Sequence, residues 1–76
     1  MNKQRRKQLN QLSERICELK DEIETLRDEE QESYDNMPEN LQYGERGERA
    51  QEAIDALDEA IDNLDSVLES IESAVE

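Results

Sequence analysis

The sequence contains no His, Trp or Phe, a single Cys, and two Tyr as its aromatic residues. The chain therefore lacks the usual ligand sets for zinc and haem and the His-dependent pairs of nucleophilic catalysis. A single Cys cannot form a disulfide within the chain, which favours a reducing, cytoplasmic location. We expect no metal, no cofactor and no catalytic residues.

Long apolar runs and basic residues are also scarce. No apolar run approaches the roughly 20 residues of a membrane-spanning helix, and the N-terminus has no apolar stretch typical of a signal peptide. Against 22 Asp and Glu stand 9 Lys and Arg, which gives a formal net charge of −13. Phosphates repel so acidic a chain, so we expect neither a membrane nor a nucleic acid as a direct partner.

The apolar residues that are present recur at alternating spacings of three and four. High charge with low hydrophobicity alone would indicate disorder, but this heptad pattern is typical of packed helices. Residues 50 and 75 continue the pattern of the second half at its two ends. The predicted hairpin core consists of Leu9, Leu12, Ile16, Leu19, Ile23 and Leu26, followed by Ile54, Leu57, Ile61, Leu64, Leu68 and Ile71.

Helix-breaking residues occur only between the two apolar patterns, at Pro38, Gly44 and Gly47. This arrangement predicts one domain, residues 1–76, with a helix over 2–34, a loop over 35–45 and a helix over 46–75. Pro38 favours a short helical turn near 38–42 within the loop. The fold class is all-α, an antiparallel two-helix coiled-coil hairpin.

The register of the hairpin is predicted by folding the chain about Asn40, so that the numbers of facing residues add up to 80. Each core residue then meets a core residue, from Leu26 with Ile54 to Leu9 with Ile71. A parallel pairing also satisfies the heptads. The loop is too short to connect parallel helices in one chain, although two chains could form them.

Near the loop, the same register brings Glu30 and Ser33 opposite Ala50 and Gly47, which predicts loose packing at that end. Four larger residues of the segment could close it, or could form a small binding knob for a partner. These residues are Tyr34, Met37, Leu41 and Tyr43.

A second apolar stripe repeats every seven residues in the second helix, beside the main pattern. It consists of Ala53, Ala60, Val67 and Ala74, whereas the equivalent positions of the first helix are Gln8, Arg15, Glu22 and Glu29. One hairpin cannot bury this wider face, so we expect a homodimer, an antiparallel four-helix bundle with this stripe at the interface. Two alternatives remain: Ala serves helix propensity alone, or a helix of another protein docks there.

The second helix is also strongly acidic: from residue 50 to the end it has nine Asp and Glu and no Lys or Arg. Five carboxylates along one edge form an acidic row, namely Glu52, Asp55, Glu59, Asp62 and Glu69. Neighbours at helical spacing lie about 5–6 Å apart, near the spacing of phosphates along a strand. The row could therefore bind a protein with a basic surface by imitating nucleic acid, or it could simply keep the chain soluble.

The N-terminus carries the opposite charge, with Lys3, Arg5, Arg6 and Lys7 before the first core leucine. Read alone, such a cluster suggests nucleic acid or an anionic membrane. In the hairpin it lies near the acidic end of the second helix, which makes charge compensation within the chain the simpler interpretation. Cys17 falls at an outward position among acidic residues, where we expect an unreactive thiol.

The segment DNMPENLQ, residues 35–42, is followed by an acidic helix rich in Ala, Leu and Ile, and the chain starts with MNKQRRKQLN. In these features the sequence resembles small acidic proteins encoded by phages and mobile elements of Firmicutes. That group has no settled activity and supplies no functional residues. The resemblance implies an intracellular accessory protein of a mobile element, a setting in which small acidic proteins block host defence or DNA-processing enzymes.

Together these features predict a non-enzymatic protein-interaction module. The sharper hypothesis is an inhibitor of a host nucleic-acid-binding or defence protein that acts through the acidic row. The alternative is an architectural or adaptor coiled coil whose charge serves only solubility.

Overall fold

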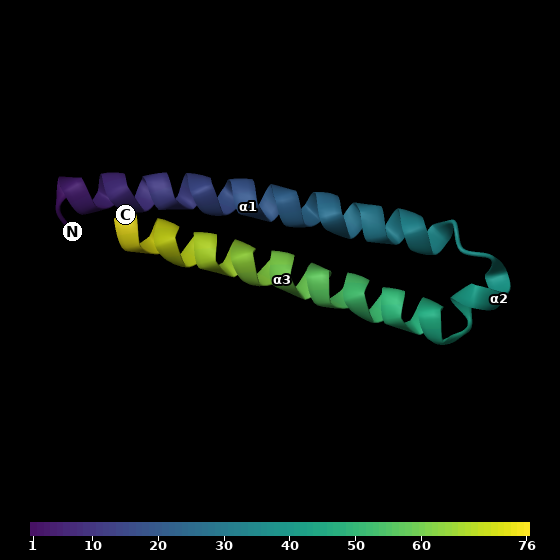
Figure 1. Cartoon of the computed structure of the whole chain (residues 1–76). Coiled ribbons are helices and arrows are strands. Elements are labelled where there is room, and N and C mark those ends of the chain that lie inside the picture. The colour runs from purple at the N-terminus through teal and green to yellow at the C-terminus, as the bar shows by residue number, and fades with distance from the viewer.

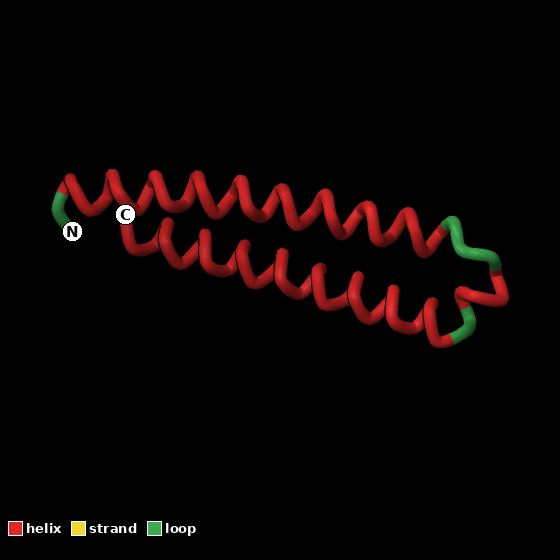
Figure 2. Tube along the Cα trace, in the orientation of Figure 1, coloured by secondary structure: helices red, strands yellow, loops and turns green.

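The computed structural model describes residues 1–76 and consists of helices without strands. Helix α1 spans Lys3–Asp35, α2 spans Glu39–Gln42 and α3 spans Glu45–Val75. The long helices α1 and α3 run antiparallel in a rod of 58 × 15 × 12 Å, with both termini at one end and α2 at the other (Figures 1 and 2). The predicted all-α hairpin is therefore confirmed, and each long helix begins within one residue of its predicted start.

The helix ends follow from local sequence. Asn2 caps α1, and its side-chain Oδ1 accepts a hydrogen bond of 2.8 Å from the Arg5 backbone N–H. Helix α3 starts after Gly44 without a side-chain cap, but Glu45 and Glu48 place negative charge in its first turn, where the helix dipole favours it. Pro38 precedes α2 as its N-cap, one position before the first turn.

The seam between α1 and α3 is a narrow line of contact. On α3, Ala50, Ile54 and Ile61 are buried, and the remaining predicted core residues of that helix are half-buried. On α1 the half-buried line has spacings of four and three, and it includes polar residues. Its members are Leu9, Ser13, Ile16, Lys20, Ile23, Arg27, Glu30 and Tyr34.

Three leucines that the sequence pattern assigns to the core are exposed instead. Leu12, Leu19 and Leu26 keep 43%, 55% and 58% of their surface, so the predicted core is wrong for them in the single chain. Two helices in contact bury only the residues that point almost directly at each other. Helix α1 is rotated so that Lys20 and Arg27 reach carboxylates of α3, which leaves these leucines at the edge of the seam.

The ion pairs across the seam join flanking residues and not core residues. Lys20 pairs with Asp65 and Arg27 with Asp58, so the residue numbers add up to 85 in both pairs. Each of the four residues directly follows a leucine of the predicted core, and a core that pairs with a sum of 80 allows flanking pairs with a sum of 85. The predicted register of the core therefore stays a prediction.

The loop end is packed tightly, so the prediction of loose packing there is wrong. Gly47 is buried, and a Cβ atom at this position would overlap the backbone carbonyl of Gln42. The Gln42 side-chain Nε2 donates a hydrogen bond of 3.0 Å to the Tyr34 carbonyl oxygen, which ties the end of α2 to α1. Met37 and Leu41 are half-buried and cover this end of the seam.

Candidate interaction surfaces

The acidic row lies on the solvent side of α3, and all five of its carboxylates are exposed. No Lys or Arg forms an ion pair with any of them. The single polar side-chain contact is from Gln51 Nε2, which donates a hydrogen bond of 3.2 Å to Asp55. The charge of the row is therefore uncompensated within the chain.

Two other carboxylates of α3 belong to the hairpin itself. Lys20 Nζ lies 2.6 Å from Asp65 Oδ1, and Arg27 Nη1 lies 2.7 Å from Asp58 Oδ1. These hydrogen bonds raise the pKa of Lys20 and that of Arg27 above their ordinary values, because each favours the charged form. Asp58 and Asp65 therefore clamp α3 to α1 and are separate from the acidic row.

These four clamp residues are not among the predicted site residues, although the sequence contains a signal for them. Lys20 and Arg27 each stand four residues after an isoleucine of the α1 core. Asp58 and Asp65 likewise stand four residues after an isoleucine of the α3 core. Opposite charges at the same heptad position of two antiparallel helices predict such pairs.

The basic N-terminal cluster is exposed and forms no ion pair, although the chain termini lie at the same end of the rod (Figure 1). None of its side chains comes within ion-pair distance of Glu69, Glu72 or Glu76. The expected charge compensation is thus limited to the basic cluster lying at the same end of the rod as the acidic end of α3, without direct ion pairs. These four positive charges remain available to another molecule.

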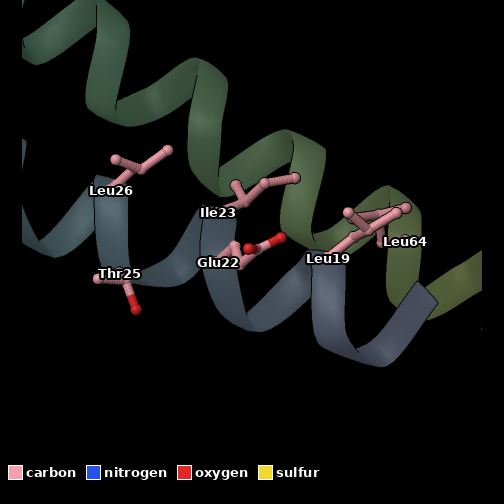
Figure 3. Close-up of a pocket in the computed structure, with 6 residues that line it drawn as sticks. All are labelled: Leu19, Glu22, Ile23, Thr25, Leu26 and Leu64. Carbon is pink, nitrogen blue, oxygen red and sulfur yellow. The ribbon is translucent and has the colours of Figure 1, made fainter. Parts of the chain in front are cut away.

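Apolar residues remain exposed along one side of the hairpin. An open groove is lined by Leu19, Ile23 and Leu26 of α1 and by Leu64 of α3 (Figure 3). In the predicted dimer stripe, Val67 is 43% exposed, Ala53 and Ala74 are exposed, and Ala60 is half-buried. The stripe is therefore accessible to a partner.

The loop offers a smaller surface. Tyr34, Met37 and Leu41 are half-buried against α3 and so act mainly as a cap, whereas Tyr43 is 80% exposed. Cys17 is a free, exposed thiol. No group of three or more metal-ligating side chains occurs, and no helix is both long and apolar enough to cross a membrane.

No protein family model matches the chain, and no curated protein or solved structure shows significant similarity to it. Four surfaces of the chain itself are available to a partner: the acidic row, the basic N-terminal cluster, the exposed leucines and the alanine stripe. The alanine stripe is the second apolar stripe of α3, formed by Ala53, Ala60, Val67 and Ala74.

Proposed function

We propose that this chain is a non-enzymatic protein-interaction module that acts as a homodimer and binds a protein with a basic surface through the acidic row. The observation that carries this proposal is the absence of any ion pair along the row, although the chain holds nine Lys and Arg. Like charges at helical spacing destabilise a helix by a few tenths of a kcal/mol per pair. A basic partner would relieve that repulsion.

The fold supports a role in binding rather than in catalysis. A rod of two helices has room for extended surfaces but not for an enclosed site, and its groove is open to solvent. The carboxylates of the row are exposed, so they resemble the phosphates of a strand more than an acid–base pair. Occupation of a nucleic-acid channel in another protein is the mechanism that follows from this arrangement.

The resemblance of residues 35–42 to small acidic proteins of phages and mobile elements supports the same setting. In that setting the chain would work in the cytoplasm, and its target would be a host nucleic-acid-binding or defence protein. Binding would lower the target's affinity for DNA or RNA by competition.

The homodimer proposal follows from the alanine stripe, whose members are accessible on α3. A second hairpin packed there forms a four-helix bundle, in which small residues allow close approach of the helices. Sedimentation equilibrium at micromolar concentration tests this step. A dimer is expected, and a strict monomer contradicts it.

The acidic row is tested by reversing four of its charges in the variant E52K/D55K/E59K/D62K. Affinity capture from nuclease-treated host lysate should retain a nucleic-acid-binding protein with the native chain and lose it with this variant. The purified target should then release labelled DNA or RNA when the native chain is added. The matched control is E14K/E18K/D21K/D28K, which makes the same charge change on α1.

The second candidate function is an architectural or adaptor coiled coil, which the exposed leucines of α1 favour. In that case the charge serves solubility alone. Equal capture of the same partner by the native chain and by the row variant would support this alternative and contradict the nucleic-acid mimic.

A further inference from the structure

The three exposed leucines of α1 form a regular row. Leu12, Leu19 and Leu26 are seven residues apart and 43–58% exposed, so they lie on one side of the helix, two turns from one another. We refer to them as the leucine row. Isolated exposed leucines are common, but three in register place apolar side chains at regular intervals along one side of the helix.

The leucine row and the alanine stripe belong to the same side of the hairpin. Leu19 and Leu26 line the groove together with Leu64 of α3 (Figure 3). On the surface of α3, Leu64 is a direct neighbour of Ala60 and Val67, four residues before it and three after it. One apolar face therefore extends from the leucine row across the groove to the alanine stripe.

The other side of the seam is closed by the clamp. Lys20 and Asp65 follow Leu19 and Leu64 directly, which turns them about 100° around their helices to the opposite side. The two sides of the hairpin thus differ: one is joined by ion pairs, and the other is apolar and open.

One side of the hairpin is long enough for a stable interface. The rod is 58 Å long and 15 Å wide, so the outline of one side is about 900 Å², which leaves room for the roughly 800 Å² that each partner buries in a standard complex. The hairpin also needs such cover, since its own buried apolar core consists of Ala50, Ile54 and Ile61. Chains of this size with so small a core are marginally stable alone.

We infer that a second copy of this chain covers the apolar face with its loop at the opposite end, so that the two α1 helices cross antiparallel at Leu19 and the two α3 helices at Leu64. This inference rests on the proposed homodimer and adds its orientation and the leucine row. About such an axis, Leu12 meets Leu26 of the other copy. Likewise Leu57 meets Ile71, and Ala60 meets Leu68, next to Val67.

Charge selects this orientation on the α1 side. Arg15 and Glu22 flank Leu19 at four residues before and three after, and neither forms an ion pair in the chain. With the α1 helices antiparallel about Leu19, Arg15 of each copy lies within one residue of the position facing Glu22 of the other, about 1.5 Å along the axis, which these long side chains span. The basic N-terminal cluster likewise reaches the region of Glu32 and Asp35 of the other copy.

Charge also permits this orientation on the α3 side. In this orientation one strip of α3 contacts the same strip of α3 in the other copy. The strip carries no charge, although the rest of the helix is acidic. Its members are Ala53, Ala56, Ala60, Asn63, Val67, Ser70 and Ala74. If both loops lay at the same end, α1 would meet α3 of the other copy, and Arg15 and Glu22 would face this uncharged strip without partners.

The orientation is tested by spin-label distances in the Cys17→Ser background, with single labels at Gln4→Cys, Gln11→Cys or Glu18→Cys. These exposed positions are seven residues apart on the outer side of α1. At 1.5 Å per residue, the separation along the axis between the two labels should be about 45, 24 and 3 Å, respectively. Equal distances at all three positions overturn the inferred orientation but leave the dimer intact, whereas a monomer overturns both.

Two sets of substitutions test the contacts themselves by sedimentation equilibrium. Leu19→Lys should weaken the dimer more than about tenfold, while the control Cys17→Lys, on the same helix but away from the face, should not. Arg15→Glu and Glu22→Arg should each weaken it several-fold, and the double variant should restore it. These residues are two turns apart within one chain, so failure of the double variant to restore the dimer contradicts the antiparallel contact.

Discussion

At the loop end of the hairpin three segments meet, whereas along the rest of the rod α1 and α3 have only each other. Gly47, Ala50 and Ile54 are buried near the loop, while Leu9 and Ile71 at the open end are half-buried. The ribbons diverge toward the loop (Figure 1), yet burial is greatest there because α2 and neighbouring apolar side chains cover the seam.

Two helices alone cannot bury a full heptad pattern. Each residue of the seam is covered only by the helix that faces it, and the sides of its side chain remain in contact with water. A third element at the loop completes the cover locally. In the middle of the rod the ion pairs of Lys20 and Arg27 hold one flank, and the leucine row leaves the other open.

The largest effect is expected when a core side chain is shortened at each end of the rod. Ile54 is 3% exposed, so the substitution Ile54→Ala should lower the free energy of unfolding by about 2–5 kcal/mol. Ile71→Ala should cost roughly half as much, because its site is half-buried and already reached by water. Urea unfolding followed by circular dichroism measures both, and equal losses would show that the two ends are packed alike.

A smaller effect is expected at the contact between α2 and α3. Gly47→Ala places a methyl group against the rigid Gln42 carbonyl and should destabilise the hairpin by roughly 1–3 kcal/mol. Gly44→Ala is the matched control, because its added Cβ would lie 3.6 Å from the nearest backbone oxygens, an ordinary contact. Thermal unfolding of the two variants should differ clearly, and similar midpoints would mean that α2 moves away easily.

The helices were predictable from the sequence because their signals are local. Pro38 and the two glycines interrupt the pattern, and the heptads on either side extend without a break. Observed and predicted helix starts accordingly agree within one residue. The buried Ile54 and Ile61 and the half-buried Ile16 and Ile23 follow from the same periodicity.

The rotation of α1 was not predictable in the same way, because it depends on contacts between the helices. A heptad pattern treats Ile16 and Leu19 as equivalent. In the structure Ile16 turns inward, in the rotation that pairs Lys20 with Asp65 and Arg27 with Asp58. The sequence predicts that the carboxylates of the acidic row share one edge of the helix, but what binds them depends on a molecule outside the chain.

The two ends of α3 differ in how well their charges suit the helix dipole. Its first turn contains Glu45 and Glu48, whereas its last turn has no basic residue and contains Glu72. Glu72→Lys should therefore stabilise the hairpin by about 0.3–1 kcal/mol at low ionic strength, and Glu48→Lys should destabilise it by a similar amount. Thermal unfolding in dilute buffer measures both, and the same sign for the two variants contradicts the dipole argument.

The smallest effect concerns the clamp in the middle of the rod, where no third element covers the seam. The hydrogen bond to Asp65 raises the pKa of Lys20 above its ordinary 10.5, so the charged form is bound more tightly in the folded chain. The stability from this pair is fully present below pH 10.5 and is lost as the pH rises through the raised value. Thermal midpoints measured across this alkaline range should fall less for Lys20→Met than for the native chain. The control Lys7→Met removes an exposed lysine that has no ion pair, so it should follow the native profile. Identical profiles for all three proteins would show that the Lys20–Asp65 pair forms without contributing to the stability of the hairpin.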